Sequence, residues 1–280
     1  MPDWRDCVNQ NVGVDRISDL SNFISIEKYS NQAPIDRFYL ETKIITSEAT
    51  PNLLKDSHWL GSLYAVAMIS VTENYFRQIF SRVLKICPIS KEHAAKNSVN
   101  LGSVIWHPKE EVERGAFEHT SLASSDNIAQ TSKKFIGLDL KDTRFGLEPV
   151  LGEFDKICEL RHGVVHSCHI VSGKNGLRLR LPESADQTKI SIRFKELQEI
   201  CAVCSNLVVT VNGLLFEQMC KRWAIEWRNY PSWHSESENK YFKDVWNAFH
   251  SSVDERNGRI NLQCTWVKCR NLVKAEFDIQ

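Results

Sequence analysis

The chain has 280 residues, and its 35 Lys and Arg balance 35 Asp and Glu, so the formal net charge is zero. Hydrophobic residues make up 42% and charged residues 25%, and this globular composition excludes long disorder or a collagen-like fibre. A balanced charge also excludes a strong global attraction to polyanions, so any nucleic-acid site must be local.

The N-terminus and the cysteines bear on where the protein works. The first ten residues contain no apolar run, so we expect no secretory signal. The longest uncharged stretches, around 57–72 and 200–216, contain polar residues and fall short of the ~20 apolar residues of a membrane span. Nine cysteines are an odd number, and without secretion they are expected to be reduced thiols. We therefore expect a cytoplasmic protein with no membrane partner.

Hydrophobic periodicity predicts the main helices of a mainly α protein. Residues 1–55 are mixed and polar, with prolines at positions 34 and 51 that read as breaks, so only short elements are expected there. Further along the chain, apolar residues recur at three- and four-residue steps, which is typical of helices with one buried face. The predicted helices span residues 57–86, 125–136, 147–171 and 194–222.

A small β-hairpin is predicted between the last two of these helices. The segment 176–181 alternates leucine with arginine, and 189–194 also alternates. Arg178 and Arg180 would then share one strand face, where, with Lys174 and Lys189 nearby, they could bind a nucleic-acid backbone. An exposed polar strand face without a ligand is an equally good interpretation.

The last part of the chain differs in composition from the rest. Five of the eight tryptophans fall within 223–280, where one helix is predicted over 238–256, ending at Asn257-Gly258. The last twenty residues are ambiguous between strand and helix. We therefore expect three parts: an N-terminal extension (1–55) packing on the bundle, a helical domain (56–222) and a C-terminal Trp-rich appendage (223–280).

One segment of helix 147–171 concentrates residues that can do chemistry. On a helical wheel with Ile157 at zero, Arg161 falls at ~40°, inside the apolar arc, and His162, His166 and His169 fall on the opposite side. A charge on a buried face is costly unless it is paired. Because Glu73 falls at the edge of the apolar arc of helix 57–86, a Glu73–Arg161 ion pair between the two helices is the simplest expectation.

Residues 161–166 read Arg-His-Gly-Val-Val-His and resemble the signature of HEPN domains, in which an arginine and usually a polar residue precede a histidine by a few positions. The order of the helices agrees, because an earlier helix carries Glu73 and a further long helix follows the signature. The resemblance covers roughly residues 56–222. It implies that Arg161, His162 and His166 correspond to the family's arginine, polar residue and histidine.

The resemblance also implies a HEPN-like helical bundle that forms a homodimer, in which two copies of the motif meet and form one composite site. Many HEPN domains are metal-independent endoribonucleases of toxin or phage-defence systems. This implies RNA as the substrate, no cofactor, and a partner such as an antitoxin or another defence-system protein.

These residue types suit RNA cleavage by the RNA's own 2′-hydroxyl. A histidine titrates near neutral pH, and an arginine stays charged and binds phosphate oxygens with two nitrogens. We expect His166 to be the general acid/base, Arg161 to stabilise the phosphate, His162 to assist and Glu73 to orient Arg161. Since Arg161 and His166 lie ~140° apart on an ideal helix, a compact site is easier to build from two chains.

Other interpretations remain. Some HEPN domains are non-catalytic dimerisation or interaction modules. One subfamily carries a modifiable tyrosine two residues after the histidine, but Cys168 occupies that position here, so that form of regulation is not expected.

Two possible metal or redox motifs have simpler explanations. Cys158, His162, His166 and His169 extend along ~16 Å of helix, too far for one zinc ion whose ligands lie ~2 Å away, so no metal site is predicted. Cys201 and Cys204 fall on the apolar stripe of helix 194–222 and are expected to pack in the core.

Overall fold

A computed structural model describes all residues except 1–2, 10–12, 14, 29, 262 and 280. It contains two compact units, Met1–Asn31 and Gln32–Gln280. The described residues of the first unit form two 3-10 helices, Trp4–Cys7 and Leu20–Phe23, and the Asp19 side chain caps the second. The expected boundary at residue 55 lies inside the second unit.

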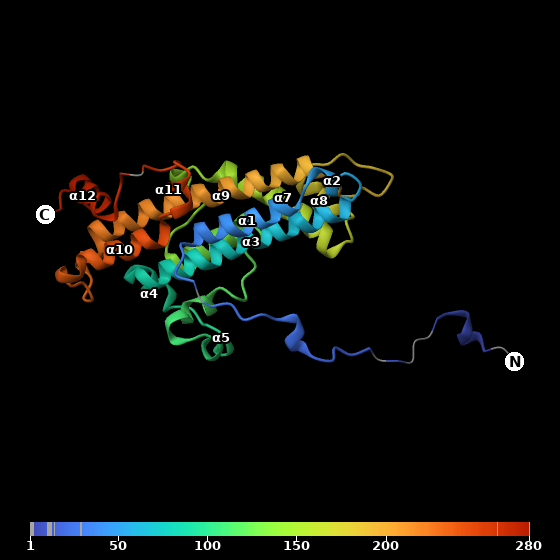
Figure 1. The fold of residues 1–280 in the computed structure, drawn as a ribbon, viewed down its shortest axis with the longest axis horizontal. Helices are drawn as coiled ribbons and strands as arrows, with labels where there is room; N and C mark the ends of the chain where they lie inside the picture. The colour runs from blue at the N-terminus through green and yellow to red at the C-terminus, as the bar shows by residue number, and fades with distance from the viewer. Residues whose placement is uncertain (1–2, 10–12, 14, 29, 262, 280) are drawn as a thin grey trace. The chain divides into compact units, whose positions relative to one another are not determined.

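The second unit is a bundle of helices (Figure 1). Helix accounts for 68% of the structure, and the described residues form no strand, only an isolated antiparallel bridge between Ile170 and Lys189. The mainly α class is thereby confirmed. The long helices are α1 (Pro34–Glu48), α3 (His58–Ile86), α7 (Glu148–His166), α9 (Phe194–Lys221), α10 (Glu238–Phe249) and α12 (Trp266–Glu276).

Shorter helices connect them: α2 (Pro51–Leu54), α4 (Pro88–Ala94), α5 (Leu101–Trp106), α6 (Ser125–Thr131), α8 (Gly173–Arg178) and α11 (Ser252–Arg256). Two π-helical turns, Ser132–Ile136 and Arg222–Glu226, directly continue α6 and α9. The predicted helices 57–86, 125–136 and 194–222 are confirmed. The predicted appendage boundary at residue 222 falls inside the continuous helical path of α9.

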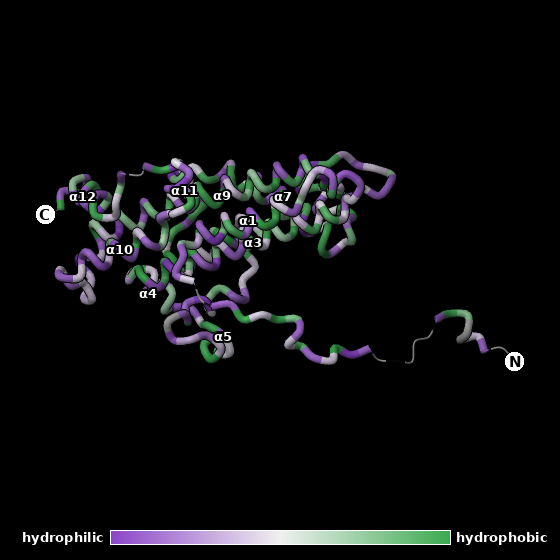
Figure 2. The backbone as a smooth tube through the Cα atoms, in the orientation of Figure 1, coloured by the Kyte–Doolittle hydropathy of each residue, from purple (hydrophilic) through white to green (hydrophobic). Residues whose placement is uncertain are grey.

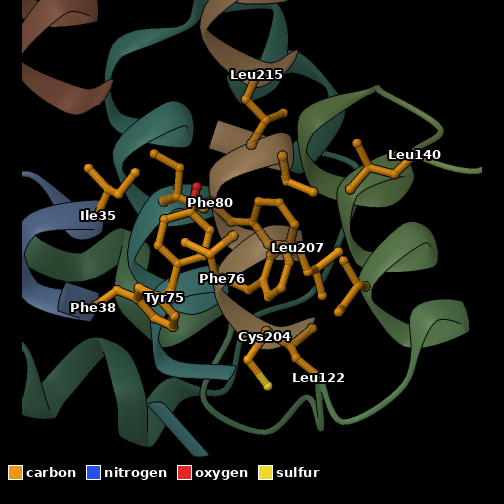
Figure 3. Close-up of a cluster of buried hydrophobic side chains, with 14 of the residues drawn as sticks. Ile35, Phe38, Tyr75, Phe76, Phe80, Leu122, Leu140, Cys204, Leu207 and Leu215 are labelled. Atoms are coloured by element: carbon orange, nitrogen blue, oxygen red, sulfur yellow. The ribbon is translucent and has the colours of Figure 1, made fainter. Parts of the chain in front are cut away.

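The core forms around α3, which packs against α1, α7 and α9. Ser57 caps its start by accepting a hydrogen bond from the Leu60 amide, and Pro88 follows its C-cap. The α3 side chains Tyr75, Phe76 and Phe80 are at most 1% exposed; Phe76 and Phe80 lie at the centre of the apolar cluster in Figure 3, and Tyr75 lies beside Phe38. Hydrophobic and hydrophilic residues are interspersed along the helices (Figure 2), and the long helices α3 and α9 bury their apolar residues in this core.

Helix α9 supplies the other wall of the core. By length and composition, Phe194–Asn229 could cross a membrane, but 44% of its most apolar window is buried inside the bundle. Its buried residues include Cys204, Leu207, Val208 and Val211, each of which is 0% exposed. A core helix of a globular protein passes the same test, so this one helix is only weak evidence for a membrane span.

The expectation of only short elements in residues 1–55 is wrong, because α1 is 15 residues long. Pro34 and Pro51, which are expected from the sequence to interrupt secondary structure, instead each occupy the first turn of a helix, α1 and α2 respectively. The first-turn amide has no intrahelical partner, so proline costs nothing there. The helix expected over 238–256 is interrupted at His250-Ser251, giving α10 and α11, and the ambiguous C-terminal residues form α12.

The predicted β-hairpin is also wrong for the described residues. Its first strand is replaced by α8, where the Ser172 side chain caps the helix by accepting from the Asn175 amide. The segment 189–194 is extended, but its alternate residues Ile190 and Ile192 are buried against helices rather than paired with a strand. A leucine-arginine alternation specifies a strand only where a neighbouring strand can satisfy its backbone.

One buried carboxylate connects the first helix of the bundle, α1, with α11 near the C-terminus. Asp36 of α1 is 3% exposed and accepts hydrogen bonds from the Ser252 amide (3.0 Å), the Ser252 hydroxyl (2.6 Å) and the Val253 amide (3.3 Å). The Ser251 hydroxyl donates to it as well. These bonds attach α1 to the start of α11.

We expect Asp36→Ala to lower the free energy of unfolding by about 3 kcal/mol, because it leaves buried hydroxyl and amide donors without an acceptor. Chemical denaturation followed by circular dichroism measures the change. Asp19→Ala, which removes a cap in the first unit, is the control and should leave the bundle transition unchanged. An equal effect of both substitutions would contradict this role of Asp36.

Candidate functional site at the end of helix α7

Helix α7 ends at His166, five residues before the predicted end. Cys168 and His169 follow with φ angles of 49° and 69°, in the left-handed region that is costly for non-glycine residues. Gly163 allows the turn to pack closely, because a Cβ there would meet Ile190 Cδ1 at 2.5 Å. The end of α7 is therefore fixed by a strained turn and a close contact.

Arg161 is half-buried at this end of α7. Its Nε is buried and has no hydrogen-bond partner, whereas its two Nη atoms are not among the buried unpartnered atoms. No ion pair joins Arg161 to any residue that the structure describes. Arg161 is therefore a half-buried guanidinium with at least one unused buried donor, Nε.

The expected Glu73–Arg161 ion pair is wrong. Glu73 is 7% exposed, and its Oε1 accepts hydrogen bonds from the Leu122 amide at 2.7 Å and from Arg77 Nη2 at 3.4 Å. The buried Leu122 amide needs an acceptor, and Glu73 provides it. Glu73 therefore does not orient Arg161 directly.

Both charges nevertheless act on the same thiol. Burial raises the pKa of Cys158 far above its ordinary value; Glu73 adds to the rise and Arg161 opposes it. Glu73 and Arg161 are therefore both near enough to Cys158 to influence its pKa, although no ion pair joins them.

The three histidines of the segment separate into two environments. His162 and His166 are exposed, and their ring centroids lie 4.7 Å apart. His169 is 7% exposed and its ring packs against Trp59, with centroids 4.1 Å apart. The wheel prediction that all three share a surface is thus correct for His162 and His166 and wrong for His169, because the helix ends before it.

Arg178 and Arg180 do not share a strand face. Arg178 ends α8 and pairs with Glu159 of α7, a hydrogen bond that raises the pKa of Arg178. Arg180 is exposed and has a φ of 54°. Arg178 therefore lies beside the α7 site, and nothing in the described contacts places Arg180 there.

A hollow of about 150 Å³ lies next to His162. Its walls include Asp155, Glu159, Lys174 and Arg178, so acidic and basic groups alternate around it. From the sequence, Lys174 was expected only to lie near a strand. In the structure it belongs to α8 and lines the same hollow as His162. Such a mixed hollow suits a polar ligand that carries both donors and acceptors.

The structure also bears on the predicted absence of a metal site and on the two cysteines of α9. Among the described residues, no group of three or more His, Cys, Asp or Glu could hold a metal ion. Cys204 is 0% exposed and burial raises its pKa to about 12; Cys201 is half-buried, and burial raises its pKa to about 11. The expected core packing is confirmed for Cys204.

Comparison of the chain with protein-family models, with curated proteins and with solved structures gives no match. The HEPN resemblance thus depends on residues 161–166 and on the order of the helices.

We expect iodoacetamide to label Cys168 in the native protein and to leave Cys158 and Cys204 unmodified. Cys168 is exposed, whereas burial raises the pKa values of the other two thiols and so suppresses the reactive thiolate. Peptide mass spectrometry measures labelling, and the unfolded protein, in which all three should react, is the control. Equal labelling rates of Cys158 and Cys168 in the native state would contradict the packing of α7.

Proposed function

We propose that this protein is a metal-independent endoribonuclease whose site contains Arg161, His162 and His166 and is completed by a second copy of the chain. The observation that carries the proposal is the state of Arg161. This half-buried guanidinium has no acidic partner among the described residues and lies on the helical segment that presents the exposed His162–His166 pair.

Arg161 is suited to bind the scissile phosphate. A cation that is partly withdrawn from water and lacks a counterion attracts an anion strongly, and a guanidinium matches two phosphate oxygens at once. The same contact would stabilise the additional negative charge that develops on the phosphoryl oxygens during cleavage.

The histidines would move the protons. His166 would take the proton of the 2′-hydroxyl, whose oxygen then attacks phosphorus and forms a 2′,3′-cyclic phosphate. The 5′-oxygen of the next nucleotide would leave with a proton from a second imidazole. His162, whose ring lies beside that of His166, or the same motif on the second copy would supply it.

A second copy is part of the proposal because the HEPN resemblance implies a composite site made from two copies of the motif. No hydrogen bond joins Arg161 to His166 within the described part of the chain, and an ideal helix separates them by ~140°. Apolar side chains surround the motif at the surface: Val165 is 46%, Trp59 59% and Leu177 81% exposed. A dimer that covered these residues would bury them and unite the two motifs.

Glu73 enters the proposal only as a support, because it holds the loop at Leu122 and does not contact Arg161. Arg178 is proposed to contact RNA near His162, and Arg180 to contribute only a general positive charge. The HEPN resemblance extends the proposal to a cytoplasmic toxin or phage-defence effector, restrained by a partner such as an antitoxin.

We expect Arg161→Ala and His166→Ala each to reduce RNA cleavage at least ~100-fold, since each removes one charge- or proton-handling group. Cleavage of a labelled RNA in EDTA measures the activity. His234→Ala and Arg256→Ala, which change exposed residues outside α7, are the matched controls. Full activity of both α7 variants, or dependence on added metal, would refute the proposed mechanism. A dimer without cleavage would instead support a non-catalytic interaction module.

We expect excess His166→Ala protein to inhibit the wild-type enzyme after the two are mixed and allowed to exchange subunits. A composite site that needs both motifs is lost in every mixed dimer, so at a constant total concentration of chains the activity should fall as the square of the wild-type fraction. Analytical ultracentrifugation of the same samples confirms the dimer. Activity proportional to the wild-type fraction would show that each chain acts alone.

A further inference from the structure

A second hollow, away from the α7 site, is lined in part by residues of α9. It has a volume of about 410 Å³ and is bordered by residues of α1, α9, α10, α11 and the loop that precedes α12. Its α9 residues begin at Val209, which is ~22 Å along the helix from Phe194. The volume is that of an ordinary small-molecule site.

Gly213 forms part of the wall of this pocket. A glycine inside a long helix is unfavourable, because it gains backbone freedom on unfolding and contributes no side chain. At Gly163 a close neighbour explains the glycine, but no atom lies within 4 Å of a Cβ built on Gly213. Gly213 is exposed, and because it lines the pocket, a larger side chain there would take up space at the open edge of the pocket.

The polar groups of the pocket are already committed to the protein. Asn212 accepts from the Tyr75 hydroxyl at 3.2 Å and donates to the Phe249 carbonyl at 3.0 Å. The Asp254 carboxylate accepts from the Tyr39 hydroxyl at 3.0 Å and from Arg259 at 3.3 Å. An unpaired ligand charge would find no free counter-charge among these groups, which favours an uncharged ligand.

The remaining walls are aromatic and flat. The rings of Trp246 and His250 are stacked, with centroids 4.1 Å apart and an interplanar angle of 20°. Phe216 packs against both Trp246 and Phe249, at 6.4 and 5.9 Å between ring centroids. Flat aromatic surfaces favour a planar ring system, which can stack or meet them edge to face.

From these features we infer that the pocket between α9, α10 and α11 binds an uncharged, planar, fused-ring aromatic molecule, with Gly213 providing the space for its ring. This inference is independent of the proposed RNA cleavage, because the two sites share no residue that carries either argument. It assigns the C-terminal helices a role as the lid and walls of a small-molecule site.

The test is calorimetric titration of the full chain with three probes: 2-naphthol, its charged counterpart 2-naphthoate, and the flexible alcohol 1-decanol. We expect saturable binding of one 2-naphthol per chain, and at least about tenfold weaker binding of the other two probes. Gly213→Leu should weaken 2-naphthol binding at least about tenfold, because its side chain occupies the pocket.

Gly152→Leu is the matched control. Gly152 is an exposed glycine inside α7, also with no atom within 4 Å of a built Cβ, so this substitution makes the same chemical change away from the pocket. It should bind 2-naphthol as the wild type does, and circular dichroism should show that both variants are folded.

Three results would overturn the inference. Equal binding of 2-naphthol by wild type and a folded Gly213→Leu variant would place the ligand elsewhere. Preference for 1-decanol or 2-naphthoate would contradict the proposed ligand class. Conversion of a wild-type dimer to a monomer by Gly213→Leu, seen by ultracentrifugation, would identify the pocket as a protein-docking site instead.

Discussion

The dry apolar contact between α3 and its neighbours α7 and α9 governs the rest of the structure. Any charged group that enters this region must be hydrogen-bonded or expelled. Glu73 is matched by the Leu122 amide, and Arg222, which is 6% exposed, donates to the Ile136 and Gly137 carbonyls at 2.8 and 3.2 Å. Among the described buried side-chain atoms without a hydrogen-bond partner, Arg161 Nε is the only one from an arginine or lysine, and both ring nitrogens of His169 are also among them. The core therefore distinguishes Arg161 from the structural charges, and this distinction connects packing to the proposed chemistry.

The sequence could predict the long helices because their apolar periodicity reflects burial on one face, as α3 and α9 demonstrate. It also placed Arg161 inside the apolar arc of its helix, and in the structure this side chain is half-buried. It could not predict the partner of Glu73, since a helical wheel gives directions around one axis and no distances between helices. The partner of Glu73 is the backbone amide of Leu122. A backbone amide is present at almost every residue, so the sequence cannot show which one needs an acceptor. His169 was misplaced for a related reason: the periodic pattern continues beyond His166, but the left-handed residues that end the helix are not glycines.

The second pocket was beyond prediction because its walls come from segments far apart in the chain. Ile35 of α1 and Trp246 of α10 meet beside α9 only after the bundle has formed. The Asp36 contacts with Ser251 and Ser252 hold α1 and α11 together at that place. One local signal was nevertheless present: Gly213 interrupts an otherwise strong helical pattern. Because Gly213 also lines the pocket, the absence of a side chain at this position leaves space at the pocket's edge.

The end of α7 combines rigidity with exposure in a way that suits a reactive site. Gly163 draws the last turn against Ile190, and the left-handed pair Cys168 and His169 ends the helix at once. His169 is buried against Trp59, which anchors the chain beyond the turn. His166 thus projects from the last helical residue of a fixed element, and not from a mobile loop. In the proposed mechanism a small displacement of His166 would reduce its efficiency in proton transfer, and the strained residues Cys168 and His169 fix the helix end that carries it.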